Sequence, residues 1–282
     1  MDQQHQQYCI VITRPEAQAA PWAAQLEHLG FHCARLNLLA ISAVAGEEQI
    51  RAIKNKILDF DLYQKVIFVS QNAVDFGMAW LEDYWPQLPI GIDYFAVGAT
   101  TAKKLASYGL AVKDLAVSET GGMTSEDLLS AEHLQAVDGD KILIFRGCGG
   151  RGHLAEELRK RGAWVDYCEL YERQLPATAS QQLTELITRS AAQLPQIIMC
   201  VHSGESLQNL QLLVSQQDAA VQHQTHRWLH SNLLLVPSQR LVAAAQEAGF
   251  NRIICAENAT DNAMTAALLN YCRTQECLSL QD

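Results

Sequence analysis

The sequence predicts an α/β protein of two similar, flavodoxin-like domains with parallel sheets, joined by a two-stranded linker, one of them discontinuous. Three observations predict this class. Short apolar or β-branched runs alternate with amphipathic helical patterns along the chain, which is typical of parallel α/β sheets. The same βα units occur twice, which indicates an internal repeat. The length of 282 residues suits two domains better than one.

Seven apolar or β-branched runs predict strands, in chain order, at 8–13, 65–69, 94–97, 141–145, 196–201, 233–236 and 252–255. Amphipathic patterns predict helices after most of them, at 17–29, 73–84, 101–108, 154–161, 205–214 and 240–248. Two shorter strands are predicted at 31–36 and 163–168. Residues 273–282 show no clear pattern, so we expect no regular structure there.

The repeat is clearest in a unit that places an arginine after a strand and a glycine after the following helix. Arg14 precedes Gly30 by the same separation as Arg146 precedes Gly162. Each glycine falls where a helix needs a C-cap, because glycine adopts the left-handed conformation of that position. The two segments therefore indicate equivalent βα units.

Three further units recur. Strands end on a serine at Ser70 and Ser203, strand-to-helix turns follow at Gly98 and Ser238, and the pairs Met123-Thr124 and Met264-Thr265 precede similar helices. The arginine unit opens the chain, whereas its counterpart follows the other three. The simplest interpretation is a discontinuous domain 1 at 1–38 and 176–282, a domain 2 at 42–170, and linkers at 38–42 and 171–176.

Composition restricts the function and the location. The net charge of −10 argues against a broad nucleic-acid surface, which needs clustered Lys and Arg. No apolar run approaches the ~18 residues of a membrane span, and the polar N-terminus is unlike a signal peptide, so we expect a cytoplasmic protein. The eight cysteines include no CxxC pair, and we expect no metal site or disulfide.

Hydroxyls, glycines and arginines gather at the strand-to-helix turns, where helix N–H groups and the helix dipole attract anions. Any one Ser, Thr or Asn at such a position is more commonly an N-cap, but six such turns together predict a site for a polyanion. The glycines 149 and 150 suit a backbone nest, and the arginines suit bidentate contacts. The predicted binding residues are Thr13, Arg14, Ser70, Gln71, Asn72, Gly98, Thr100, Thr101, Arg146, Gly147, Gly149, Gly150, Arg151, Ser203, Gly204, Ser206, Ser238, Gln239 and Arg240.

Other chemistries find less support. No Ser/His/Asp order, zinc motif or P-loop lysine is present, and His226 and His230 read as surface residues. One motif favours an alternative: residues 147–152 match G-x-G-x-x-G after a strand, with Glu169 about twenty residues further on, which is the local context of a dinucleotide site.

Seven motifs, taken together and in order, resemble the uroporphyrinogen-III synthase family from about residue 9 to about residue 270. They are Val-Ile-Thr-Arg-Pro at 11–15, Phe-Val-Ser-Gln-Asn-Ala-Val at 68–74, Ala-Val-Gly-Ala-Thr-Thr-Ala at 96–102, Phe-Arg-Gly-Cys-Gly-Gly-Arg at 145–151, Tyr-Glu-Arg at 171–173, Ser-Gly-Glu-Ser-Leu at 203–207 and Val-Pro-Ser-Gln-Arg at 236–240. Val69 and His202 replace threonines that are common in the family.

The resemblance implies two domains joined by a two-stranded linker, a monomer, and no metal or redox cofactor. It implies hydroxymethylbilane, with eight carboxylates, as the substrate. The hydroxymethyl group leaves as water, ring D attacks through its substituted carbon, and a spirocyclic intermediate reopens with ring D inverted. A transient contact with the preceding hydroxymethylbilane synthase is a further possible partnership.

The resemblance and the position at a domain crossing both make Tyr171 the candidate proton donor to the leaving hydroxyl, because a phenol O–H can donate. A structural linker tyrosine, with a substrate carboxyl as the donor, is the alternative. For the whole chain, two other functions stay open: an NAD(P)-dependent oxidoreductase that uses Gly147–Gly152, and a cytosolic two-domain binding protein.

Overall fold

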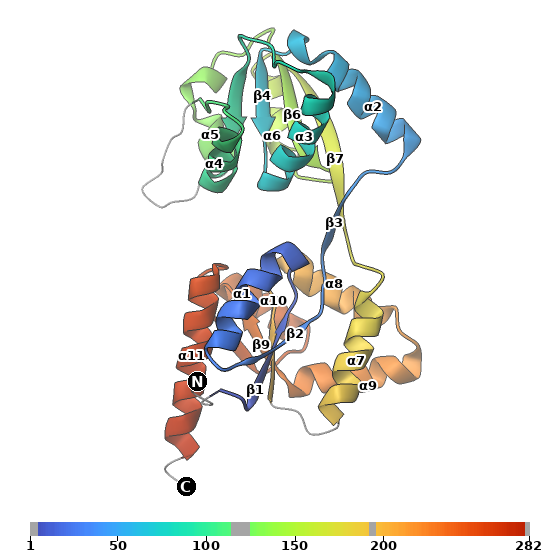
Figure 1. Ribbon diagram of the computed structural model, residues 1–282, viewed down its shortest axis with the longest axis vertical. Helices are drawn as coiled ribbons and strands as arrows, with labels where there is room; N and C mark the ends of the chain where they lie inside the picture. The colour runs from blue at the N-terminus through green and yellow to red at the C-terminus, as the bar shows by residue number, and fades with distance from the viewer. Residues whose placement is uncertain (1–4, 114–124, 192–195, 280–282) are drawn as a thin grey trace. The chain divides into compact units, whose positions relative to one another are not determined.

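The computed structural model describes residues 5–113, 125–191 and 196–279, and Figure 1 shows the arrangement of their helices and strands. The chain forms two compact units. Unit 1 comprises Met1–Ala40 and Gln174–Asp282, and unit 2 comprises Ile41–Arg173. Each unit is a mainly parallel sheet with helices on both faces, which confirms the predicted α/β class. Met123 and Thr124 of the predicted repeat lie outside the described residues.

Unit 1 contains a five-stranded sheet in which every described strand pair is parallel. The strands are β1 (Tyr8–Ile12), β2 (His32–Arg35), β8 (Gln196–Cys200), β9 (Leu233–Val236) and β10 (Ile253–Cys255). Their order in the sheet is β10-β9-β8-β1-β2. Counted along the chain this is the flavodoxin-like order 2-1-3-4-5.

Strand β1 shows why the sheet is buried on both faces, because alternate side chains of a strand point to opposite sides. Cys9 and Val11 pack against α7 (Ala179–Ala191), α8 (Gly204–Ser215), α9 (Ala219–Ser231) and α10 (Gln239–Glu247). Tyr8, Ile10 and Ile12 pack against α1 (Glu16–His28) and α11 (Asp261–Ser279). The five-residue run of β1 is therefore wholly apolar or aromatic.

Unit 2 repeats this order with a different chain connection. Its strands are β3 (Ala40–Ala43), β4 (Lys65–Phe68), β5 (Asp93–Ala96), β6 (Lys141–Gly147) and β7 (Trp164–Gln174), arranged β3-β7-β6-β4-β5. Val112 adds an isolated parallel bridge beyond β5, at Tyr94. The series β7, β6, β4, β5 and Val112 thus matches β2, β1, β8, β9 and β10. Since β6 is equivalent to β1, the structure explains why the arginine unit comes last in unit 2.

Two helical layers cover the unit 2 sheet. One contains α2 (Glu47–Leu58), the 3-10 turn η1 (Phe60–Leu62), α3 (Gln71–Tyr84) and α4 (Ala99–Ser107). The other contains α5 (Ser125–Leu129), the 3-10 turn η2 (Glu132–Leu134) and α6 (His153–Lys160). Gly30 and Gly162, one residue beyond the C-caps of α1 and α6, both have φ of 90°, as their predicted capping role requires.

The expectation for the tail is corrected. The tail is helical through Ser279, in continuation of α11, which packs on unit 1 through a buried stripe of Met264, Leu268 and Cys272. The segment predicted as a linker from residue 171 begins inside β7, which extends as far as Gln174. The boundaries between the units fall within β3 and at the end of β7, which are neighbours in the sheet. Among the described helices, none has the length and apolarity of a membrane span.

Candidate active site

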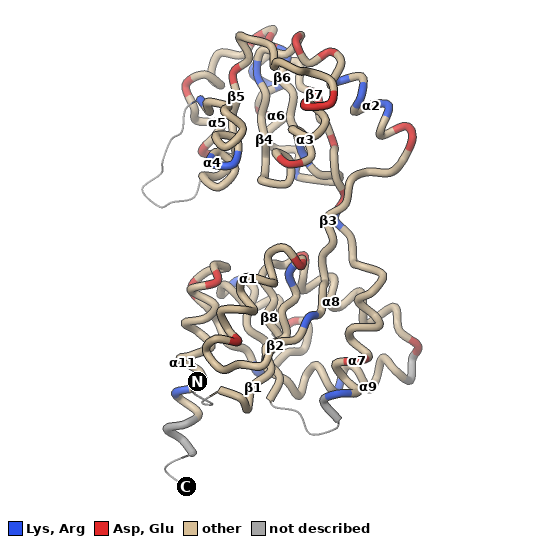
Figure 2. Tube along the Cα trace, in the orientation of Figure 1, with Lys and Arg blue, Asp and Glu red and all other residues tan. Residues whose placement is uncertain are grey.

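The predicted binding residues lie at the carboxyl ends of parallel strands, in the turns that lead into helices. In unit 1 these turns follow β1, β8 and β9, and in unit 2 they follow β4, β5 and β6. Because β1, β8 and β9 pair in parallel in unit 1, and β6, β4 and β5 do so in unit 2, each unit brings its own set together at one sheet edge, the usual ligand edge of such folds. Figure 2 shows Lys and Arg interspersed with Asp and Glu in both units. The predicted anion-binding groups therefore belong to individual turns and not to a broad basic surface.

In unit 1, two of these turns begin on a serine in extended conformation. The Ser203 hydroxyl accepts a hydrogen bond from the Ser206 backbone N–H at 3.1 Å, and the two hydroxyl oxygens lie 3.0 Å apart. Ser206 is buried. Ser238 occupies the N-cap of α10 but makes no capping bond with its side chain, and Gln239 and Arg240 after it are exposed. The turn after β9 therefore presents the more accessible polar groups.

In the turn after β1, Thr13 is buried and Arg14 is partly exposed. Thr13 is fully buried, and its hydroxyl donates to the Cys200 carbonyl at 2.7 Å, which ties the end of β1 to the end of β8. Arg14 forms an ion pair with Asp261, the first residue of α11, and keeps 22% of its side chain exposed. The sequence analysis did not predict Asp261 as a site residue, because Asp261 and Arg14 are 247 positions apart.

His202, between β8 and Ser203, was also not predicted as a site residue. Its ring meets Trp22 edge-on with centroids 5.0 Å apart, and among the described residues neither of its buried ring nitrogens makes a well-formed hydrogen bond. Burial and the nearby Arg14 guanidinium lower the pKa of His202 to about 3, although the Cys200 backbone opposes the shift. The ring is therefore neutral at physiological pH.

Replacing His202 with glutamine is expected to flatten the acid side of the stability profile. The folded state binds fewer protons than the unfolded state between about pH 3 and pH 6.5, so His202 lowers stability as the pH falls through that window. The slope attributable to this residue is at most about 1.4 kcal/mol per pH unit. Urea unfolding of both proteins at several pH values measures it, and parallel profiles would contradict the buried neutral ring.

In unit 2, the turn after β4 is the most elaborate. The Ser70 hydroxyl caps α3 by accepting from the Ala73 N–H at 3.1 Å and lies 2.8 Å from the Tyr171 hydroxyl. Gln71 is exposed and Asn72 is half-buried. After β5, Gly98 begins α4 with φ of 90°; Thr100 is exposed, whereas Thr101 is buried.

Tyr171 lies inside β7, in the unit 2 sheet, and only 1% of it is exposed. Its ring stacks on Phe76 with centroids 5.4 Å apart. Its carbonyl accepts from the Cys148 N–H at 2.8 Å. Tyr171 is thus a packed residue of the sheet, and its hydroxyl reaches the serine that caps α3.

The buried side chain of Arg146 makes hydrogen bonds to the backbone of the glycine-rich turn after β6. Its side chain is 6% exposed, and it donates to the carbonyls of Gly147 at 3.2 Å and Arg151 at 3.3 Å. Its guanidinium stacks 4.3 Å from the Tyr167 ring centroid and pairs with Glu169 at 3.6 Å. The direct anion contact predicted for Arg146 is therefore blocked, whereas the backbone of Gly149 and Gly150 and the side chain of Arg151 are exposed.

The same geometry argues against the dinucleotide interpretation of this turn. Glu169, the expected ribose ligand, is paired with Arg146. Burial, with Glu169 and Glu172 nearby, raises the pKa of the Cys148 thiol, so the turn holds no thiolate nucleophile at neutral pH.

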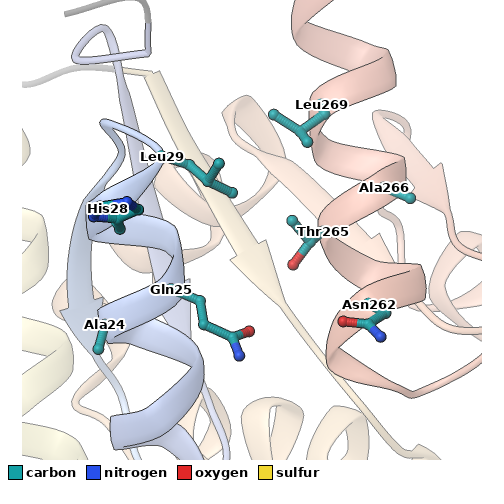
Figure 3. A pocket seen from close by; sticks show the side chains of 8 residues that line it. All are labelled: Ala24, Gln25, His28, Leu29, Asn262, Thr265, Ala266 and Leu269. Carbon is teal, nitrogen blue, oxygen red and sulfur yellow. The ribbon is translucent and has the colours of Figure 1, made fainter. Parts of the chain in front are cut away.

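Two other features do not form an anion site. A groove of about 810 Å³ between α1 and α11 (Figure 3) is lined by residues such as Gln25, Leu29, Thr265 and Leu269, with no Lys or Arg among its lining side chains. His226 and His230 lie side by side on α9, with ring nitrogens 3.4 Å apart. Within the described ranges, no three His, Cys, Asp or Glu side chains gather as metal ligands.

Comparisons with known proteins identify the family. The family model described as uroporphyrinogen-III synthase HemD matches residues 20–266. The chain is 32% identical over 262 residues to uroporphyrinogen-III synthase of Escherichia coli K12 and 34% identical over 260 residues to that of Salmonella typhimurium LT2, covering 92% of this chain and 99% of each relative.

Solved structures support the fold. A mutant uroporphyrinogen III synthase from the extremely thermophilic bacterium Thermus thermophilus matches with a TM-score of 0.54 at 16% identity over 95% of this chain and 99% of that one. The Helicobacter pylori 26695 synthetase gives 0.54 at 15% identity over 93% and 98%. The chain therefore belongs to the uroporphyrinogen-III synthase family and has the family's activity, that of a cyclising lyase in tetrapyrrole biosynthesis.

Proposed function

We propose that the chain converts hydroxymethylbilane to uroporphyrinogen III by holding its carboxylates at the carboxyl edges of both sheets. Membership of the family carries the activity. The observation that supports the site is that both units carry equivalent strand-to-helix turns, after β1, β8 and β9 and after β6, β4 and β5. Backbone N–H groups at helix N-termini bind carboxylates without adding titratable cations, which suits an acidic protein with an acidic substrate.

The predicted residues divide into two roles in this proposal. The accessible groups bind substrate carboxylates: Arg14, Ser70, Gln71, Asn72, Gly98, Thr100, Gly149, Gly150, Arg151, Ser203, Gly204, Ser238, Gln239 and Arg240. The buried Thr13, Thr101, Arg146 and Ser206, together with Gly147, shape the turns from behind. Arginines among the first group add charge-assisted, bidentate contacts.

The chemistry requires one proton for the leaving hydroxyl. The C–O bond of the hydroxymethyl group breaks, water leaves, and the remaining azafulvene carbon is attacked by the substituted carbon of ring D. The spirocyclic intermediate then reopens and recloses with ring D inverted. We assign the proton to Tyr171, delivered through its hydrogen bond to Ser70, because Tyr171 is buried and Ser70 is the accessible end of the pair. The rest of catalysis is positioning, since the linear molecule closes without inversion when it is unassisted.

Isomer analysis tests this function. Purified protein is given hydroxymethylbilane, the product is oxidised to porphyrin, and the type I and type III isomers are separated by chromatography. Type III in excess over a control without enzyme is the expected result. Type I alone, formed at the spontaneous rate by a folded protein, would contradict the proposal.

We also propose that the enzyme acts as a cytoplasmic monomer without metal or redox cofactor. The net charge of −10 supports the expectation that it has no nucleic-acid partner. Transient contact with the preceding hydroxymethylbilane synthase stays a prediction, as does the absence of a membrane partner.

A further inference from the structure

The ion pair between Arg14 and Asp261 joins two distant parts of the unit 1 sheet edge. Arg14 follows β1, whereas Asp261 begins α11 after β10, three strands away in the sheet order. Arg14 also lies close enough to His202, at the end of β8, to affect its titration. The pair therefore sits over the same edge that carries the predicted carboxylate-binding turns.

The position of Asp261 is fixed by the start of α11. The Asn258 side-chain oxygen accepts from the Thr260 N–H at 3.0 Å, and the Thr260 hydroxyl accepts from the Ala263 N–H at 3.3 Å. One turn further on, the Thr265 hydroxyl accepts from the indole N–H of the fully buried Trp22 at 2.9 Å. Asp261 is thus presented by a capped helix that is tied to α1.

Arg14 keeps most of its hydrogen-bonding capacity. A guanidinium has five N–H donors, and among the described residues Arg14 donates to Asp261 alone, through Nη1. With 22% of the side chain exposed, the guanidinium is held but not enclosed. His202 is neutral beside it, so it does not compete as a cation for Asp261.

We propose that Asp261 is a positioning residue for substrate binding, which holds the Arg14 guanidinium at the sheet edge with its remaining N–H groups free for a carboxylate of the tetrapyrrole. This inference rests on the proposed function. An ion pair that only stabilises the fold would contribute to the free energy of unfolding. A positioning residue contributes to substrate affinity as well. An oriented arginine binds a carboxylate in a fixed geometry, and that orientation is lost when its anchor is removed.

Steady-state kinetics of Asp261→Asn, Arg14→Lys and the double variant test the role. Asp261→Asn is expected to raise KM about tenfold with kcat within about twofold. If Asp261 acts through Arg14, the double variant has a KM no higher than the worse single variant. Asp261→Glu, which keeps the carboxylate, is expected to have a KM within about threefold of the wild-type value.

The matched control is Asp140→Asn, which breaks the comparable Lys65–Asp140 pair at 2.5 Å in unit 2, outside the predicted binding residues. It is expected to leave KM unchanged. An unchanged KM in Asp261→Asn, multiplied effects in the double variant, no rescue by glutamate, or an equal rise in Asp140→Asn would each overturn the inference. Absence of type III product from the wild type would instead contradict the proposed function, and the inference with it.

Discussion

Replacing Tyr171 with phenylalanine is expected to lower turnover about 100-fold or more, while the Kd for uroporphyrinogen III changes by less than about twofold. The ring keeps its contacts with Phe76 and Gly147, and only the hydroxyl that lies 2.8 Å from Ser70 Oγ is lost. Single-turnover kinetics measures the chemical step, and anaerobic titration with the product measures binding. Loss of turnover without loss of binding is the signature of a group that acts in the transition state.

Tyr94→Phe is the matched control for this variant. Tyr94 lies in β5 of the same sheet and is also buried. Its hydroxyl has no hydrogen-bond partner among the described residues. We expect this variant to keep wild-type turnover. If Tyr171→Phe turns over within about threefold of the wild-type rate, the proton comes from another donor, with the substrate carboxyls the first alternative.

Replacing Gly147 with alanine is expected to lower the free energy of unfolding by about 2–3 kcal/mol. A Cβ at this position would lie 2.5 Å from Tyr171 Cε2, and Tyr171 cannot move away freely because it is buried in β7 and stacked on Phe76. Displacing the ring also moves its hydroxyl from Ser70, so turnover is expected to fall with stability. Urea unfolding and the isomer assay measure the two effects.

Gly204→Ala provides the comparison for stability. A Cβ at Gly204 would meet only Leu241 Cδ2, at 4.0 Å, and the residue starts helix α8. We expect its free energy of unfolding to stay within about 0.5 kcal/mol of the wild-type value. Equal stability changes in the two variants would show that the contact between Gly147 and Tyr171 is not the cause.

The sequence predicts the framework because the framework depends on local patterns. Arg14 to Gly30 and Arg146 to Gly162 each span one βα unit, so strand, helix and C-cap can be read from neighbouring residues. The serines at 70 and 203 are N-caps whose extended conformation and hydrogen bonds the structure confirms. Cap and strand-end positions are set within a few residues, which is the range that sequence patterns describe.

The remaining features depend on contacts between distant residues. The pair of Arg14 and Asp261 requires α11 to return to the end of β1 across 247 residues. The burial of Arg146 depends on Glu169 and Tyr167 of the next strand, which no local spacing indicates. The sequence places Tyr171 at the crossing between the domains. Its place inside β7 depends instead on the neighbouring strands of the sheet, including β3. In each case the partner side chain decides the role.

The most direct test of the binding site is to map where the product binds, by titrating the protein with uroporphyrinogen III under anaerobic conditions and following backbone amide resonances by NMR. The binding proposal predicts that the largest shifts occur at the strand-to-helix turns of both units, near Ser203 and Ser238 and near Ser70 and Gly149. Shifts confined to one unit, or centred on the groove between α1 and α11, would contradict it.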